Sequence, residues 1–272
     1  MSFNIEISPT VVVGNDQPLL IIAGPCQIES LEHSLKIADY LQKNLSDLPI
    51  NLVYKSSFDK ANRTSLSGKR GPGIEEGLKI LDQVKQETSL PLLTDVHSPE
   101  QASLAAEVVD ILQTPAFLCR QTDLLIAVGQ TGKAINVKKG QFLQPEDMRY
   151  AIEKVTSTGN SKVLLCERGT TFGYRDLIVD MRSLVSMREL GYPVIFDATH
   201  SVQSMGGLSG ASGGNPAFIP PLSRAAAAVG IDGLFIECHQ DPSSAPSDGN
   251  SMLPLELVRG VVEKVCQIRS VL

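Results

Sequence analysis

Eight short apolar runs, rich in Val, Ile and Leu, recur along the chain with amphipathic stretches between them. The runs lie at residues 19–23, 51–55, 92–96, 108–113, 135–139, 163–167, 194–198 and 233–237. Nearly continuous apolar segments of this length are typical of parallel strands that are buried on both faces. The stretches that follow show helical spacing. The first has Ser30 as a candidate N-cap, and later apolar residues recur every three or four positions, as in 74–84. Helices are also predicted over 177–190 and from Pro254 to the end of the last apolar pattern.

Eight strand–helix units predict a closed (β/α)8 TIM barrel, because eight parallel strands are the number that closes this fold. A length of 272 residues suits one such barrel, so we predict a single catalytic domain spanning 1–272. Two short β-like runs within 3–13 predict a hairpin that closes the bottom of the barrel, and we assign 1–18 to this extension. The apolar pattern alone leaves an open doubly wound sheet as the alternative.

Composition narrows the classes of partner. The net charge is −6 and the sequence pI is about 5.3, which argues against nucleic acid or an anionic membrane as a partner. The first residues lack the features of a signal peptide, and no apolar run is long enough to span a bilayer. Five cysteines without a CxxC pair indicate reduced thiols rather than a disulfide framework. These features predict a cytoplasmic protein that acts on small molecules.

Polar side chains stand at the end of every predicted strand. In this fold such side chains share one bowl, which is where the active site lies. They are Cys26, Lys55, Asp95, His97, Gln113, Lys138, Glu167, Arg168, Asp197, His200 and Glu237. Three long segments, 56–73, 201–221 and 240–254, follow strands on the same face and are typical of binding loops. The pattern predicts an active-site bowl.

Basic residues gather around these strand ends although the chain is acidic overall. They are Lys55, Lys60, Arg63, Arg70, Arg120, Lys138, Lys139 and Arg168. Any one of them could be a solvated surface charge. As a group they predict a cleft that binds anions, because clustered cations attract phosphate and carboxylate groups and bind them through charge-assisted hydrogen bonds.

A candidate metal site follows from barrel closure. Strand eight would lie beside strand one, so a thiolate, an imidazole and two carboxylates could converge at Cys26, His200, Glu237 and Asp248. This ligand set suits zinc, ferrous iron or manganese. His97 and His239 are alternative ligands, and a lone buried cysteine is more often a small apolar side chain.

Longer motifs give a family resemblance. They are AGPCQIES (23–30), KSSFDKANRTS (55–65), TDVH (94–97), QTPAFLCRQTDL (113–124), NVKKGQF (136–142), ERGTTFGY (167–174), DATHSVQ (197–203) and FIECH (235–239). Together they resemble the 3-deoxy-D-manno-octulosonate 8-phosphate synthase family nearly end to end. The resemblance implies condensation of phosphoenolpyruvate with D-arabinose 5-phosphate, which releases inorganic phosphate, on the pathway to lipopolysaccharide. It also implies a homotetramer.

The resemblance implies roles for individual residues. Phosphoenolpyruvate would be bound by Lys55, Lys60, Arg120, Lys138 and Arg168, with Gln113 and the Ala116–Phe117 backbone close by. The sugar phosphate would be bound by Asn62, Arg63 and Thr64, where the family often has Ser in place of this threonine. Lys60 and Lys138 would act in catalysis, with Asp95 and His97 handling protons or orienting their neighbours. The metal ligands would be Cys26, His200, Glu237 and Asp248, and this cysteine implies the metal-dependent branch.

Two other functions stay open at this point. One is the related seven-carbon synthase of the shikimate route, which uses erythrose 4-phosphate. Its loop reads Lys-Pro-Arg-Thr, whereas Lys60 is followed here by Ala-Asn-Arg, which favours the eight-carbon enzyme. The other is a barrel that binds a phosphorylated metabolite without catalysis. The identity of the metal is also open, and so is its action on water or on the aldehyde.

Overall fold

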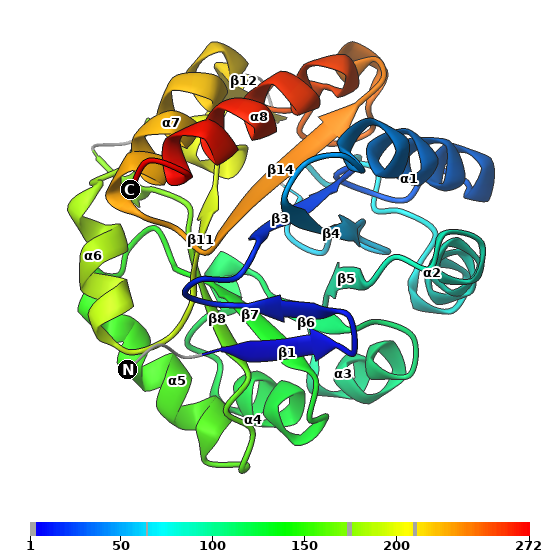
Figure 1. Cartoon of the computed structure of the whole chain (residues 1–272). Helices are drawn as coiled ribbons and strands as arrows, with labels where there is room; N and C mark the ends of the chain where they lie inside the picture. The colour runs from blue at the N-terminus through cyan, green and yellow to red at the C-terminus, as the bar shows by residue number, and fades with distance from the viewer. Residues whose placement is uncertain (1–3, 64, 173–175, 209–210) are drawn as a thin grey trace.

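Eight parallel strands form a closed barrel in the computed structural model, which describes residues 4–63, 65–172, 176–208 and 211–272 (Figure 1). The barrel strands are β3 (Leu19–Gly24), β4 (Ile50–Lys55), β5 (Leu92–Asp95), β6 (Ile111–Thr114), β7 (Ala134–Lys138), β8 (Val163–Glu167), β11 (Val194–Asp197) and β14 (Gly233–His239). Strand β14 pairs with both β11 and β3, which closes the sheet. The predicted (β/α)8 barrel is confirmed, and the open-sheet alternative is wrong.

Helices surround the barrel on its outer side (Figure 1). They are α1 (Leu31–Leu45), α2 (Ile74–Thr88), α3 (Pro99–Ala106), α4 (Thr122–Gln130), α5 (Met148–Thr156), α6 (Arg182–Glu189), α7 (Ile219–Val229) and α8 (Val258–Arg269). Helix α1 begins as expected, since Ser30 Oγ accepts a hydrogen bond from the His33 backbone N–H at 3.1 Å. Among the described helices, none combines the length and apolarity required to cross a membrane.

Alternation along the strands produces two apolar layers. In β3, Leu19, Ile21 and Ala23 join the layer between strands and helices, whereas Leu20 and Ile22 join the cluster inside the barrel. Successive strand side chains point to opposite faces, so a continuous apolar run can serve both layers.

The N-terminal segment plugs one end of the barrel. Strands β1 (Ile5–Ser8) and β2 (Val11–Val13) pair antiparallel, and their buried side chains join the cluster inside the barrel. Asn51 Nδ2, near the start of β4, donates to the Val12 carbonyl at 2.9 Å. In Figure 1 the hairpin crosses the near end of the barrel. The predicted hairpin is confirmed, and it leaves the carboxyl ends of the strands for the active site.

Some element boundaries differ from the predictions. A helix expected over 177–190 begins only at Arg182, because Leu177–Ile178 forms β10, which pairs with β9 (Thr170–Thr171). A helix expected from Pro254 begins at Val258, since Leu253–Pro254 forms β15 beside β14. The loop expected over 201–221 contains an antiparallel pair, β12 (Gln203–Leu208) and β13 (Ala211–Gly214). Backbone pairing with another segment, nearby for β9–β10 and β12–β13 and farther along the chain for β14–β15, overrode the local pattern in each case.

Gly24 is a residue where the barrel admits no side chain. Its φ is +156°, and a Cβ here would lie 2.0 Å from the Lys55 carbonyl oxygen. We expect Gly24→Ala to lower the free energy of unfolding by roughly 3 kcal/mol or more, measured by chemical denaturation. Gly260→Ala is the control, because Gly260 lies in α8 with no atom near the added Cβ. A Gly24→Ala protein as stable as the parent would contradict this packing.

Candidate active site

A cavity of about 380 Å³ opens at the carboxyl ends of the barrel strands. Most of the residues proposed from the sequence line it: Lys55, Lys60, Asn62, Arg63, Asp95, His97, Gln113, Ala116, Phe117, Lys138, Arg168, His200, Glu237 and Asp248. Parallel strands bring these side chains together because all their carboxyl ends lie at the same end of the barrel. The predicted bowl therefore exists.

Lys55 and Glu237 form a buried ion pair between β4 and β14, the two strands on either side of β3. Lys55 Nζ donates to Glu237 Oε1 at 2.6 Å and to the Cys26 carbonyl at 2.9 Å. Burial by itself would raise the pKa of Glu237, but the charge of Lys55, followed by His200, holds this pKa well below its usual value. Glu237 Oε2 has no hydrogen-bond partner among the described residues. One oxygen of a buried carboxylate is thus available to a ligand.

Three potential metal ligands converge next to this ion pair. One sulfur or carboxylate atom from each of Cys26, Glu237 and Asp248, here called the Cys26 cluster, lies within 4.8 Å of the others. Cys26 Sγ donates to Asp248 Oδ2 at 3.0 Å. Burial raises the pKa of Cys26, and Asp248 and Glu237 raise it further against the opposite effect of Lys60 and Lys55, so the thiol is neutral unless a metal ion binds to it. His200 Nε2 is 3.7 Å from Glu237 Oε2, which places the imidazole at the edge of this cluster.

Asp248 has a backbone conformation that favours its place in the Cys26 cluster. Its φ is +55°, a left-handed conformation that Asp tolerates better than most residues. The Asp248 carbonyl accepts from the N–H groups of Ser251 and Met252, and Gln203 Nε2 donates to Asp248 Oδ1 at 3.0 Å. The turn and Gln203 together fix the carboxylate.

Lys138, Asp197 and His200 form a second charged group. In the strand order around the barrel this group lies on the β11 side of β14, whereas Lys55 lies on the β3 side. Asp197 Oδ2 is 2.5 Å from Lys138 Nζ and 2.7 Å from His200 Nδ1. Burial would raise the pKa of Asp197, but His200 and then Lys138 lower it well below its usual value. Lys138 Nζ also lies 3.8 Å from the centre of the Phe235 ring. Asp197 thereby orients both cavity-lining groups.

Lys60 belongs to a chain of hydrogen bonds with Ser57, Asp95 and His97. Lys60 Nζ donates to Ser57 Oγ at 2.8 Å, and Ser57 Oγ donates to Asp95. His97 Nε2 is 3.1 Å from the other Asp95 oxygen. Burial would raise the pKa of Asp95, but Lys60 and then His97 bring it well below its usual value. The result is an ionised carboxylate between a cation and an imidazole.

Arg168 has a buried guanidinium group with hydrogen-bond donors that can still bind a ligand. The residue is 5% exposed, and its Nη2 donates to Gln203 Oε1 at 2.9 Å. Its Nη1 has no hydrogen-bond partner among the described residues. Burial lowers the pKa of Arg168, yet arginine stays charged near neutral pH. Such a group is suited to bind an anionic ligand in the cavity.

Two long loops meet over the cavity. Arg63 Nη1 donates to Ser247 Oγ, and Arg63 Nη2 lies 3.4 Å from the Pro246 carbonyl. This contact joins the segment after β4 to the segment after β14. Loop residues therefore form the mouth of the cavity, while the strand ends form its floor.

Several residues proposed from the sequence are not brought to the cavity. Arg120 is exposed and lies in a separate hollow with Cys119 and Lys154. Lys139 is buried, with its Nζ 3.1 Å from Thr170 Oγ1, and Arg70 forms an exposed ion pair with Asp59. Thr64 is outside the described residues. His239 does not join the Cys26 cluster, since its Nε2 is 2.8 Å from Glu29.

Three residues orient side chains in the cavity; the sequence indicates no site role for Gln203 and Ser57 and places Asp197 in the predicted bowl without a specific one. Gln203 connects Arg168 to Asp248, Ser57 connects Lys60 to Asp95, and Asp197 connects Lys138 to His200. The spacing of three residues between Asp197 and His200 was the one sequence signal that could have indicated such a pairing. The other contacts depend on where distant segments meet.

Comparison with known proteins places the chain in a family. The model of the DAHP synthetase I family matches residues 2–270. The chain belongs to this family. Members of the DAHP synthetase I family most similar to it include the 2-dehydro-3-deoxyphosphooctonate aldolase of Syntrophotalea carbinolica. That protein is 56% identical over 261 residues, which are 96% of this chain and 94% of the relative.

Two further relatives in the DAHP synthetase I family have the same name. The 2-dehydro-3-deoxyphosphooctonate aldolase of Desulfatibacillum aliphaticivorans is 52% identical over 269 residues, 99% of this chain and 98% of the relative. That of Magnetococcus marinus is 56% identical over 246 residues, 90% of this chain and 86% of the relative. The resemblance seen in the motifs is therefore confirmed.

Proposed function

We propose that this protein condenses phosphoenolpyruvate with D-arabinose 5-phosphate to give 3-deoxy-D-manno-octulosonate 8-phosphate and inorganic phosphate, in the synthesis of lipopolysaccharide. The names of relatives that are 52–56% identical over nearly the whole chain support this reaction. The structural observation that carries the proposal is the convergence of Lys55, Lys60, Lys138 and Arg168 on one cavity. Four cations in one partly enclosed site suit a substrate that has both a phosphate and a carboxylate.

The charged groups divide the cavity between two substrates. Arg168 and Lys138 are deep in the barrel and buried, so they would bind the carboxylate and phosphate of phosphoenolpyruvate, with Lys55 and Lys60 beside them. Gln113, Ala116 and Phe117 would line this site. Asn62 and Arg63 lie on the loop at the mouth and would bind the phosphate of the sugar.

The proposed reaction forms one C–C bond, adds water and breaks one C–O bond, and these residues would assist different steps. Carbon 3 of phosphoenolpyruvate attacks the sugar aldehyde and forms the new C–C bond, and water adds at carbon 2. The adduct then loses phosphate as its C–O bond breaks. Lys60, Lys138 and Arg168 would stabilise the charge that develops on oxygen, because fixed cations in a site shielded from water need little reorganisation. The Asp95–His97 pair would accept or return a proton.

A divalent cation fits the Cys26 cluster. Glu237 Oε2 has no hydrogen-bond partner among the described residues, and the sulfur and carboxylate donors lie within 4.8 Å of one another. We propose that Cys26, Glu237 and Asp248, together with His200, hold zinc, ferrous iron or manganese. A cation there would polarise an oxygen of the aldehyde or of water as a Lewis acid. The protein would place His200 for this role through its bond to Asp197.

Phosphate release tests the proposal directly. We expect rapid release of phosphate from phosphoenolpyruvate with arabinose 5-phosphate, and a rate at least about 100-fold lower with erythrose 4-phosphate, because a polar site binds and positions its own sugar best. A preference for erythrose 4-phosphate would assign the seven-carbon reaction instead. Binding of phosphoenolpyruvate without phosphate release from either sugar would show a non-catalytic barrel.

We also propose that the protein is a cytoplasmic homotetramer. The family resemblance supports the assembly, and the acidic composition agrees with small-molecule rather than nucleic-acid partners. Arg120 is left without a role in the cavity of its own chain.

A further inference from the structure

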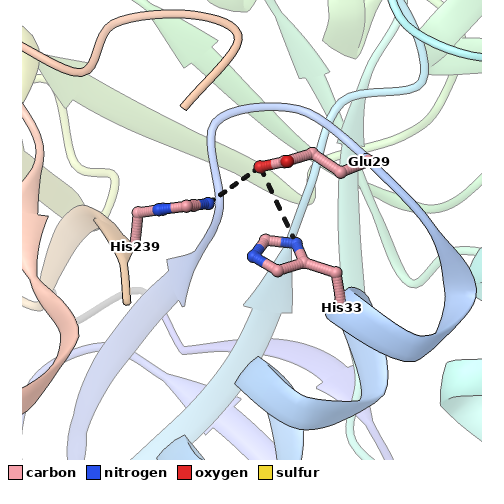
Figure 2. A group of neighbouring side chains, drawn as sticks. All are labelled: Glu29, His33 and His239. Atoms are coloured by element: carbon pink, nitrogen blue, oxygen red, sulfur yellow. Dashed lines mark hydrogen bonds and ion pairs between the residues drawn. The ribbon is translucent and has the colours of Figure 1, made fainter. Parts of the chain in front are cut away.

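A second group of metal-binding side chains lies outside the cavity, near the seam where the first and last barrel strands pair (Figure 2). Glu29, His33 and His239, here called the His239 cluster, each offer one ligand atom within 4.8 Å of the others. Glu29 immediately precedes the N-cap of α1, His33 lies in the first turn of α1, and His239 ends β14. We propose that the His239 cluster is a second divalent-metal site of the zinc-binding class, separate from the Cys26 cluster.

The geometry of the His239 cluster fits three ligands around one ion. Figure 2 shows the carboxylate of Glu29 facing both imidazoles, with its Oε1 2.8 Å from His239 Nε2 and 3.9 Å from His33 Nδ1. The two rings have centroids 4.8 Å apart and planes tilted by 39°. Zinc bonds of about 2.0–2.2 Å place neighbouring N and O ligands roughly 3.3 Å apart. Small side-chain rotations would bring the three atoms to that spacing.

His33 gives an independent indication of a ligand. Its side chain is 10% exposed, yet neither ring nitrogen has a hydrogen-bond partner among the described residues. Buried polar atoms rarely lack partners in native proteins, and an ion is one recognised reason for an exception.

His239 and Glu29 supply the remaining requirements of such a site. His239 Nδ1 lies 2.7 Å from the Asp241 carbonyl oxygen and 3.0 Å from the Asp241 backbone nitrogen, and the tautomer with a proton on Nδ1 donates to that carbonyl. A backbone carbonyl bonded to one imidazole nitrogen is the usual way to fix a metal-binding ring, and it leaves Nε2 to face the ion. The side chain of Glu29 is 31% exposed, so water can reach a fourth coordination position. Two histidines, one glutamate and a water form a known zinc ligand set.

Position in the fold suggests what this ion would do. None of the three residues lines the cavity, so the ion would not touch the substrates. It would instead join the start of α1, which follows β3, to the end of β14. Because β3 and β14 are the strands that close the barrel, the bound ion would stabilise closure and the segment that carries Cys26.

Metal stoichiometry tests the proposal on the full-length protein. Apoprotein is loaded with Zn²⁺ or Co²⁺, freed of excess metal, and its metal content measured together with its far-ultraviolet circular dichroism. We expect Cys26→Ala to retain about one equivalent per chain, and Cys26→Ala with His33→Gln to retain essentially none. In Co²⁺-loaded Cys26→Ala, the d–d bands of a site with nitrogen and oxygen ligands should persist without thiolate charge transfer. These bands should vanish in the double variant.

Matched variants keep the result interpretable. Glu32→Gln alters an exposed carboxylate in the same turn of α1 and should change neither metal content nor spectrum when added to Cys26→Ala. His239→Gln should act like His33→Gln and provides a second variant if the first fails to fold. Folded Cys26→Ala protein that holds no cobalt would overturn the proposal. So would equal metal content with and without the histidine substitutions. Neither result depends on phosphate release, so the proposed reaction is tested separately.

Discussion

Replacing Arg168 by alanine is expected to lower kcat/KM for phosphoenolpyruvate by about 100- to 1,000-fold, the range observed when one preorganised donor to a developing oxyanion is removed. Arg168 is 5% exposed, and its Nη1 is a cationic donor with no partner among the described residues. Its other arm bonds Gln203, which in turn bonds Asp248. The substitution would therefore remove the positive charge that faces the substrate. It would also loosen the contact that fixes one side of the Cys26 cluster.

Two further variants separate charge from geometry at Arg168. Arg168→Lys keeps the positive charge but loses the fork that can bind Gln203 and an anion together, so we expect only partial recovery of kcat/KM. Arg182→Ala removes an exposed arginine paired with Asp180 and should leave the kinetics unchanged. Steady-state phosphate release at varied phosphoenolpyruvate gives kcat and KM for each variant. An Arg168→Ala enzyme with the kinetics of the parent would rule out the proposed role.

Replacing Cys26 by alanine is expected to abolish tight metal binding at the Cys26 cluster and to lower kcat by more than about 100-fold, since even changes beyond the direct ligands commonly cost 10- to 100-fold. Cys26 Sγ lies 3.0 Å from Asp248 and belongs to the only described group that combines a thiol with carboxylates at the cavity. Without the sulfur, Glu237 and Asp248 would retain weak affinity for harder cations.

Chelation provides the matching experiment on the unmodified protein. Activity should fall after thorough treatment with a chelator and return with added manganese, zinc or ferrous iron. Cys266→Ala is the control, because Cys266 lies in α8, away from the cavity, and its loss should affect neither metal content nor rate. Full activity in a Cys26→Ala protein, or in metal-free parent protein, would refute metal dependence.

The strand positions could be predicted closely from the sequence because burial on both faces requires a nearly continuous apolar run. A strand such as β3 must be apolar at every position, since Leu20 faces the inside of the barrel and Leu19 faces the helices. The polar residue that follows each run, such as Lys55 or Lys138, then marks the catalytic end. The number of runs and these polar ends were enough to predict the barrel and most residues that line the cavity.

Boundaries set by backbone pairing outside the barrel sheet could not be predicted in the same way. Leu253–Pro254 becomes a strand because β14 extends past the barrel and offers free backbone groups. Leu177–Ile178 becomes a strand because it meets β9. The structure of these short segments depends on the backbone that they contact in the folded chain.

The sequence by itself determined the eight strand–helix units, the catalytic end of the strands and the residue types gathered there, because hydrophobic periodicity is a local property of the chain. Closure of the sheet was decided by the pairing of β14 with both β11 and β3. The tertiary structure alone decided which of those residues meet. It joined Lys55 to Glu237, separated Arg120 from the cavity of its own chain, and paired His239 with Glu29 and not with the Cys26 cluster. Charges and ligands act over a few ångströms, and separations of that size are fixed only when distant segments pack together.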